Sequence, residues 1–465
     1  MSPHPDHWAL DPSGVRGPAR PAGDDRPANG GSNPLVQRLH RGFVMTSWTS
    51  LTPLAALLAT SFGCSAPSVD TPVGSPSTTP PSSAGGDEGG ATGDPAATPT
   101  PASRSDGPLA VVAIDLQQVF FDTAGKRNPT SGIAQRMARS AHIFELAGAH
   151  HIPVFMTFEA TRTGDHALPP SLVTALPAQS LQIIKTTFAA TGQPQFLPAI
   201  QASGARRLMV VGAETDVCIL QTILGLRRAG YEVIAVSDAL FTEEINIPPA
   251  VRRMRQAGVV ELGMQDAETL LTTGGSSPTP PVTSAPPVIL KPLETGILLH
   301  DLEGLTAADR NSLQKMVRLR ELLLISEWFR LPVFAADPAV ALAALPANLR
   351  SILTRPITAL ANRPSSVTQL AVAGGHAGIG AAVAALAGKV DVFLIEDTLI
   401  GGGTADLEPL YVSGAIPSTY KTLYYELTQS VDDAGWPSQQ WVTDGNARYY
   451  DLTMAPEELP PLTVQ

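Results

Sequence analysis

Four short apolar segments and a glycine-containing turn occur twice in this chain, in the same order, and this repetition limits the fold more than any other feature. Turn-forming residues bound each segment, and helical patterns separate the segments. Short apolar runs that alternate with helices are typical of parallel β-sheets covered by helices. The chain is therefore predicted to be α/β, with a three-layer αβα arrangement and a mostly parallel, Rossmann-like sheet, duplicated in tandem. The matching segments are 110–116 with 296–302, 152–155 with 331–334, 208–212 with 370–374, 233–238 with 392–397, and 257–259 with 413–415.

Two tracts rich in Pro, Ser, Thr and Gly divide the chain. They hold almost no bulky apolar residues and therefore predict linkers. The first residues of the chain are rich in Pro, Gly and charge, which predicts disorder. The predicted organisation is a disordered segment 1–44, a signal-like segment 45–64, a linker 65–107, a domain 108–273, a linker 274–287, a second domain 288–430 and a C-terminal tail 431–465.

The apolar stretch 51–62 follows basic residues and ends at Gly63-Cys64. This order is similar to a bacterial lipoprotein signal and predicts lipid on Cys64. The protein would then be exported and held at the membrane by its lipid anchor alone, in the bacterial periplasm or at the cell surface. A weakly hydrophobic membrane helix is the rival interpretation. Without a working signal the protein would be cytoplasmic, and both Met1 and Met45 are candidate starts.

Charge and cysteine content exclude some functions. The formal net charge is −11, which argues against a nucleic-acid partner. The chain has two cysteines, Cys64 and Cys218. If one carries lipid and the other is a nucleophile, no pair remains for an intramolecular disulfide.

Cys218 lies where a strand, a tight turn and a helix are predicted to follow one another. An apolar run, 208–211, precedes the turn, and an amphipathic segment, 219–229, follows it. Unpaired N–H groups and the positive end of the helix dipole lower the pKa of a thiol at such a place, and the N–H groups can bind an oxyanion. A lone cysteine is more often an inert core residue, so the assignment needs further groups.

Two charged residues supply those groups. Asp115 ends the apolar run 109–114, and Lys185 follows Ile183-Ile184. In parallel α/β sheets, binding sites form at the edge where the strands end. Asp115, Lys185 and Cys218 are therefore predicted to share one site.

With these residues the sequence resembles the isochorismatase-like cysteine hydrolases over about residues 109–271. The family signature is an Asp after the first strand, a Lys in the middle, and a Cys that ends a Gly-x-x-Thr-x-x-Cys turn. The segments that carry the resemblance are Asp115-Leu116-Gln117 with Phe120-Phe121, Lys185-Thr186-Thr187-Phe188, the turn 212–218, Val236-Ser237-Asp238-Ala239 and Ala257-Gly258-Val259.

The resemblance implies an Asp-Lys-Cys triad that cleaves a C–N bond, amide or carbamoyl, of a small molecule. Asp115 would accept the thiol proton of Cys218, Lys185 would stabilise both anions, and an acyl-thioenzyme would form. The backbone N–H groups of Glu214 and Cys218 would form the oxyanion hole, with a cis peptide at Ala213–Glu214. No cofactor is implied.

The sequence indicates the substrate less clearly than it indicates the type of reaction. Nicotinamidases of the family bind a metal through an Asp-x-His motif after the second strand. Here the corresponding run, 156–159, has no histidine. No metal is therefore predicted, and nicotinamide is not the favoured substrate. Phe121, Glu159 and Phe188 are candidate pocket walls.

The second copy is predicted to be degenerate. Asp301 occupies the aspartate position, but Gly380 falls where Cys218 stands, and the lysine position falls near Thr354, beside Arg355. Such a pseudoenzyme domain could pair with the first copy as an intramolecular pseudo-dimer, or the chain could form homo-oligomers. The alternative function is a catalytically idle, surface-anchored binding or scaffold protein. A redox role is disfavoured because the chain has no resolving cysteine.

Overall fold

The structure is a computed structural model, and it describes residues 107–127, 132–160, 166–242, 247–273, 286–306 and 313–430. The predicted disordered segment, the signal-like segment with Cys64, most of both linkers and the C-terminal tail lie outside these ranges. Within them, no helix combines the length and the apolar character that a membrane span requires.

The first copy is built on six parallel strands in the order β3-β2-β1-β4-β5-β6. All residues of its central strand β1 are buried, and successive side chains enter two different hydrophobic cores. Burial on both faces explains why the strand is a continuous apolar run instead of an alternating one. The strands are β1 (Leu109–Ile114), β2 (Val154–Glu159), β3 (Leu181–Lys185), β4 (Arg207–Gly212), β5 (Glu232–Leu240) and β6 (Val260–Leu262).

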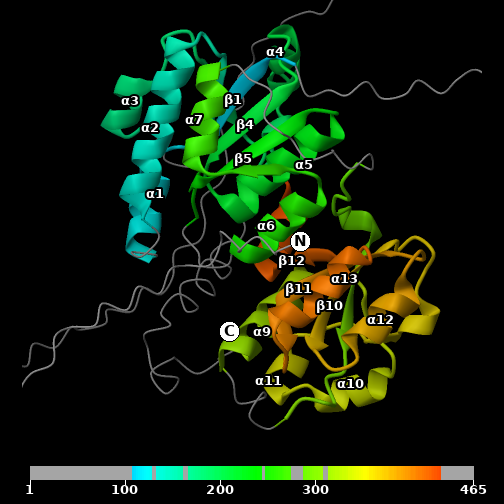
Figure 1. Cartoon of the computed structure of the whole chain (residues 1–465). Coiled ribbons are helices and arrows are strands. Elements are labelled where there is room, and N and C mark those ends of the chain that lie inside the picture. The colour runs from blue at the N-terminus through cyan, green and yellow to red at the C-terminus, as the bar shows by residue number, and fades with distance from the viewer. Residues whose placement is uncertain are drawn as a thin grey trace, which may run out of the picture. The chain divides into compact units, whose positions relative to one another are not determined.

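Helices cover both faces of this sheet, which confirms the predicted three-layer arrangement (Figure 1). Residues of α2 and α7 fill the core on one face, and residues of α4, α5 and α6 fill the core on the other. The helices are α1 (Gln118–Arg127), α2 (Ile133–Ala149), α3 (Pro170–Ala175), η1 (Ala190–Gly192), α4 (Phe196–Ala202), η2 (Thr215–Ile219), α5 (Leu220–Arg228), α6 (Ile247–Gln256) and α7 (Met264–Thr273).

The second copy repeats this sheet, with six parallel strands in the corresponding order β12-β11-β10-β7-β8-β9. Its strands are β7 (Thr295–His300), β8 (Val333–Ala335), β9 (Thr358–Ala359), β10 (Gln369–Gly375), β11 (Asp391–Ile400) and β12 (Ile416–Ser418). Its helices are η3 (Pro292–Glu294), α9 (Leu313–Trp328), α10 (Pro338–Ala344), α11 (Ala347–Arg350), η4 (Leu360–Asn362), α12 (Ile379–Leu386), η5 (Thr404–Leu407), α13 (Glu408–Val412) and α14 (Tyr420–Thr428).

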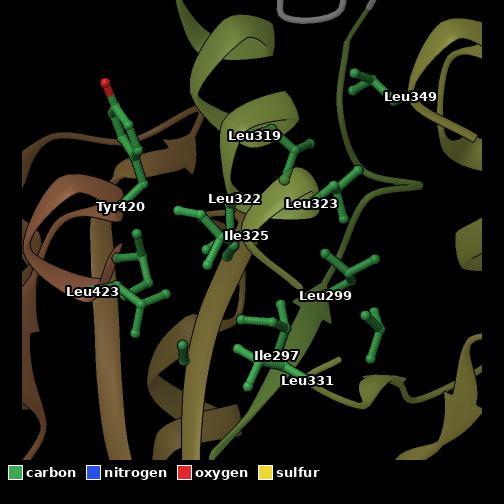
Figure 2. Close-up of a cluster of buried hydrophobic side chains, with 14 of the residues drawn as sticks. Ile297, Leu299, Leu319, Leu322, Leu323, Ile325, Leu331, Leu349, Tyr420 and Leu423 are labelled. Carbon is green, nitrogen blue, oxygen red and sulfur yellow. The ribbon is translucent and has the colours of Figure 1, made fainter. Parts of the chain in front are cut away.

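This copy has a hydrophobic core of its own. Ile297 and Leu299 of β7 face Leu319 and Leu323 of α9, and Leu423 of α14 belongs to the same cluster (Figure 2). The tandem duplication predicted from the five repeated segments is therefore confirmed at the level of fold.

Backbone geometry identifies equivalent residues in the two copies. Gly212 has φ 124° and Gly374 has φ 116°. A Cβ atom on Gly212 would lie 2.0 Å from the carbonyl oxygen of Ile114, and one on Gly374 would lie 2.3 Å from that of His300. Only glycine tolerates such an approach, so both positions depend on it. Asp115 and Asp301 follow the same strands with φ 49° and φ 45°.

The register corrects the predicted position of the missing lysine. Phe155 pairs with Leu181 in the first sheet, and its equivalent Phe334 pairs with Thr358 in the second. Four residues beyond Leu181 stands Lys185, and four beyond Thr358 stands Asn362. The register thus places the lysine position after Thr358 instead of near Thr354; β9 ends at Ala359 and η4 follows it, so the equivalent residue itself stays a prediction.

The equivalence of Gly380 and Cys218 stays a prediction. In the first copy, η2 and then α5 follow Gly212, and Cys218 lies within η2. In the second copy, α12 begins only five residues after Gly374, and Gly380 is its second residue. The two turns therefore differ in shape, and a residue count does not transfer between them.

The two copies contact each other through buried polar groups. Arg253 of α6 forms a bidentate ion pair with Glu426 of α14, with distances of 2.8 and 2.7 Å. Arg252 pairs with Glu396 of β11, and the Gln256 side chain donates to the carbonyl oxygen of Ala415 at 2.7 Å. The predicted pseudo-two-fold relation between the copies stays a prediction.

Candidate active site

Four functional side chains gather at the carboxyl edge of the first sheet. Asp115 directly follows β1, Glu159 is the last residue of β2, and Lys185 is the last residue of β3. Cys218 lies in η2, the turn of π-helix that follows β4. The parallel arrangement brings these strand ends together, so residues 103 positions apart in the sequence meet at one place.

The ammonium group of Lys185 lies at the centre of this group. Its Nζ is 2.7 Å from Oδ2 of Asp115, 3.4 Å from Sγ of Cys218 and 3.7 Å from Oε2 of Glu159. Asp115 and Lys185 are 0% exposed and Cys218 is 2% exposed. The structure thus brings together the three residues that the sequence selected, while their chemical roles stay a prediction.

Asp115 is fixed by the neighbouring strand. Its backbone N–H donates to the carbonyl oxygen of Thr157 at 3.0 Å, and the Thr157 hydroxyl donates to its Oδ1 at 2.9 Å. Its other carboxylate oxygen faces Lys185. Both oxygens therefore have a defined partner, which holds the carboxylate in one orientation.

Glu159 contacts Cys218 directly, which sequence reasoning missed when it named this residue only as a pocket wall. The Cys218 thiol donates to Oε2 of Glu159 at 3.3 Å. Gln117 fixes the backbone of Glu159: it accepts from the Glu159 N–H at 2.7 Å and donates to the Glu159 carbonyl oxygen at 3.2 Å. The signal was present, because Glu159 ends a predicted strand just as Asp115 does.

The electrostatics of the thiol differ from the sequence-based expectation. Burial raises the pKa of Cys218 well above its ordinary value; Lys185 opposes this shift, and the charges of Asp115 and Glu159 add to it. The expected lowering at a helix N-terminus is therefore outweighed by desolvation and by two nearby carboxylates. The resting thiol is therefore protonated near neutral pH. A slow reaction of Cys218 with a thiol-alkylating reagent at that pH would not by itself show that the site is inactive.

The other two charges also shift. Burial alone would lower the pKa of Lys185, but the charges of Asp115, Cys218 and Glu159 together raise it above its ordinary value. Burial raises the pKa of Glu159, and the Asp115 charge adds to this, while Lys185 opposes it. Glu159 thus holds a proton more readily than an ordinary glutamate does.

One group of potential metal ligands occurs among the described residues, formed by Asp115, Glu159 and Cys218, whose ligand atoms lie within 4.8 Å of one another. The Lys185 ammonium stands among these atoms, at 2.7 to 3.7 Å from each of the three. A divalent cation would meet a positive charge there. The donor set therefore fits the ammonium better than a metal ion.

The turn that carries Cys218 begins with a cis peptide between Ala213 and Glu214, as the family resemblance implies. The next residue is tied to the strand beside it, because both the N–H and the hydroxyl of Thr215 donate to the carbonyl oxygen of Phe241 at 3.0 Å. This anchors the turn at its start. The oxyanion-hole role of the Glu214 and Cys218 N–H groups stays a prediction.

The two aromatic candidates for pocket walls are core residues. Phe121 is 2% exposed and stacks on Phe241 with ring centroids 4.3 Å apart. Phe188 is also 2% exposed, and its ring meets that of Tyr425 edge to face at 4.8 Å. Their part in a substrate pocket stays a prediction.

The fold and site define a Rossmann-like α/β domain with a buried cysteine, lysine and carboxylate at its strand ends. Residues 109–260 match the isochorismatase domain family model. This segment is therefore an isochorismatase-family domain, and the second copy shares its fold. The family assignment made from the three signature residues is confirmed.

Individual relatives are more distant. The chain is 35% identical over 74 residues to the secreted isochorismatase effector Isc1 of Phytophthora sojae, covering 16% of this chain and 35% of that protein. It is 28% identical over 115 residues to the "Probable hydrolase YcaC" of Escherichia coli, covering 24% and 55%. The match thus spans about a third and about half of these relatives. The MAR1 ribonuclease structure from Caenorhabditis elegans is 23% identical, with a TM-score of 0.32, over 39% of this chain and 97% of that one.

Proposed function

We propose that this protein is an isochorismatase-family hydrolase that cleaves the C–N bond of a small amide or carbamoyl compound through an acyl-thioenzyme. The observation that carries the proposal is the position of the Lys185 ammonium, 2.7 Å from the Asp115 carboxylate and 3.4 Å from the Cys218 sulfur in a buried site. A nucleophile, a base and a fixed positive charge thus lie within reach of one reacting atom.

The two carboxyl groups are suited to different tasks. The ammonium is closer to Asp115 than to Glu159, so Asp115 is the better compensated anion, and we assign it the role of base. Glu159 has the raised pKa, and its side chain is 18% exposed, so it can exchange protons with solvent. Two neighbouring carboxyl groups in different environments can thus divide the roles of base and acid.

The first half-reaction follows from these roles. Asp115 takes the proton of the Cys218 thiol, and the sulfur attacks the carbonyl carbon to form a C–S bond. The tetrahedral intermediate places its oxyanion at the turn that begins with Glu214. As the C–N bond breaks, Glu159 gives its proton to the departing nitrogen, and the amine leaves.

The second half-reaction restores both groups. The Glu159 carboxylate takes a proton from water while the water oxygen attacks the thioester carbon. The C–S bond breaks, the carboxylic acid leaves, and the sulfur recovers its proton from Asp115. The sum is amide plus water giving acid plus amine, and the enzyme returns to its starting state.

A screen of small amides and carbamoyl compounds tests the proposal, with Cys218→Ala as the matched control. We expect at least one compound to be hydrolysed by the wild type, with turnover reduced on the order of 10⁴-fold in the variant because no acyl-thioenzyme can form. Rapid quenching and mass spectrometry should detect the acyl adduct on Cys218. Hydrolysis that survives in Cys218→Ala would exclude the thiol mechanism.

The variant Glu159→Gln tests whether Glu159 acts as the general acid or as the general base. A glutamine cannot give a proton to nitrogen, so release of the amine in a single turnover should slow about 10²-fold for unactivated alkyl amides, whereas for activated anilides, which leave without protonation, it should slow less than tenfold. Turnover by the wild type should decline as the pH rises through the raised pKa of Glu159, and the variant should lose this decline. Asp115→Asn should impair both substrate classes. Equal losses for both classes in Glu159→Gln would assign it the role of base instead.

A further inference from the structure

Helix α14 of the second copy lies on the turn that carries the nucleophile of the first copy. Lys421, in its first turn, donates from Nζ to Oε2 of Glu214 at 2.9 Å and lies 3.4 Å from Oδ2 of Asp216. The hydroxyl of the next residue, Thr422, donates to the backbone carbonyl oxygen of Asp216 at 3.1 Å. Three contacts from one helix thus hold two residues of the turn that ends at Cys218.

The other end of α14 reaches the segment that follows the catalytic lysine. The N–H of Phe188 donates to the carbonyl oxygen of Gln429 at 3.2 Å. Ser430 forms an antiparallel bridge with Thr187, and its hydroxyl donates to the carbonyl oxygen of Thr186 at 3.3 Å. One short segment of the second copy therefore contacts both chain segments that carry the predicted chemistry of the first.

A positive charge of the second copy faces the negative charges at the cysteine turn of the first. Lys421 is 1% exposed and Asp216 is 0% exposed. Within the first copy, Oδ1 of Asp216 accepts from the Thr242 hydroxyl at 3.0 Å, which is a neutral partner. The positive charge that faces Oδ2 of Asp216 and the carboxylate of Glu214 comes from Lys421, and burying such anions without a counter-charge is strongly unfavourable.

We propose that α14 is part of the active site of the first copy and that Lys421 is its positioning residue. By holding the side chains of Glu214 and Asp216, the ammonium sets the course of the turn that carries the proposed oxyanion donors, the N–H groups of Glu214 and Cys218. A shift of about 1 Å in such donors costs up to 10²-fold in rate. The degenerate copy thus contributes a residue to catalysis although it has lost the lysine and the cysteine.

The test compares Lys421→Gln, which keeps a hydrogen-bond donor but removes the charge, with Lys421→Arg, which keeps the charge. Gln256→Ala is the matched control, because Gln256 also bonds across the two copies but touches neither catalytic segment. All variants carry Cys64→Ser, so that Cys218 is the single thiol. The readouts are kcat and KM for a hydrolysed amide, the pH profile of alkylation of Cys218 by iodoacetamide, and the Tm.

In Lys421→Gln, kcat should fall about tenfold to 10²-fold with little change in KM, because the oxyanion donors move while the ground-state contacts remain. The pH profile of Cys218 alkylation should move to higher pH. The reason is that the carboxylates of Glu214 and Asp216, in the turn that carries Cys218, lose the counter-charge of Lys421. Lys421→Arg should keep the profile close to that of the wild type, and Gln256→Ala should change only the Tm.

A Lys421→Gln protein with an unchanged kcat and alkylation profile, whatever its Tm, would overturn the inference and leave Lys421 as an interface residue. Should that variant not fold, Thr422→Val removes one hydrogen bond to the turn without removing a charge. An unchanged kcat in Thr422→Val would also overturn the inference. The kinetic arm rests on the proposed function, whereas alkylation needs no substrate. Failure of the hydrolysis proposal would therefore leave the alkylation result readable.

Discussion

Replacing Lys185 with methionine is expected to abolish turnover and to destabilise the first copy more than any other single change at the site. Lys185 and Asp115 form an ion pair at 2.7 Å in which both side chains are 0% exposed. Removing one partner of a buried pair leaves an uncompensated charge and costs about 3–5 kcal/mol of the free energy of unfolding. Turnover should fall on the order of 10⁴-fold, as for the loss of other members of a catalytic triad.

Urea unfolding as a function of pH measures the first effect. The loss of stability should be greatest near neutral pH and should shrink as the pH falls into the range where carboxylic acids protonate, because a neutral carboxyl group needs no counter-charge. The double variant Asp115→Asn/Lys185→Met should regain most of the stability but no activity. Lys389→Met is the matched control, since the ammonium of this exposed lysine bonds only one backbone carbonyl among the contacts described.

A Lys185→Met protein that is as stable as the wild type, or that still hydrolyses substrate, would contradict the role of the ammonium as the central counter-charge. Recovery of stability without activity in the double variant would separate folding from chemistry. The buried charges would then serve catalysis at a cost in stability, as is common for perturbed groups in active sites.

The sequence predicted the chemistry at strand ends because that information is local. An apolar run followed by a charged residue marks a strand and what stands at its carboxyl end, so Asp115, Lys185 and Cys218 could be identified one at a time. Their meeting follows from parallel topology alone. The same argument applies to Glu159, which ends β2. Its position beside the Cys218 sulfur, however, depends on the register of β2 against β3, and the apolar pattern does not specify that register.

What could not be predicted depends on packing between distant segments. The raised pKa of Cys218 results from complete burial together with two carboxylates, whereas the sequence shows only the favourable helix terminus. Lys421 is separated from Glu214 by 207 residues, and nothing in its local pattern distinguishes it from a solvated lysine. That the lysine position of the second copy does not fall near Thr354 emerged only from strand pairing, because the segment before β9 differs from its counterpart.

A second large effect is expected at the contact between the two copies. Arg253 and Glu426 are each 2% exposed, and the guanidinium also lies 5.3 Å from the centre of the Phe393 ring in the second copy. Arg253→Met should therefore cost about 3–5 kcal/mol, because Glu426 stays buried without its partner. Arg255→Met, two residues along α6, removes an ion pair whose arginine is 45% exposed and should cost less than about 1 kcal/mol.

Two probes can follow the two copies separately during urea unfolding. Of the five tryptophans in the chain, Trp328 in α9 is the one that lies between residues 108 and 430, so fluorescence reports on the second copy once the tryptophans at positions 8, 48, 436 and 441 are replaced with phenylalanine. In a Cys64→Ser background, the accessibility of Cys218 reports on the first. If the buried ion pair couples the copies, both probes should show one transition in the wild type and separate midpoints in Arg253→Met. Restoring an apolar contact with Arg253→Met/Glu426→Leu should bring the midpoints together again, and separate midpoints already in the wild type would show that the copies unfold independently.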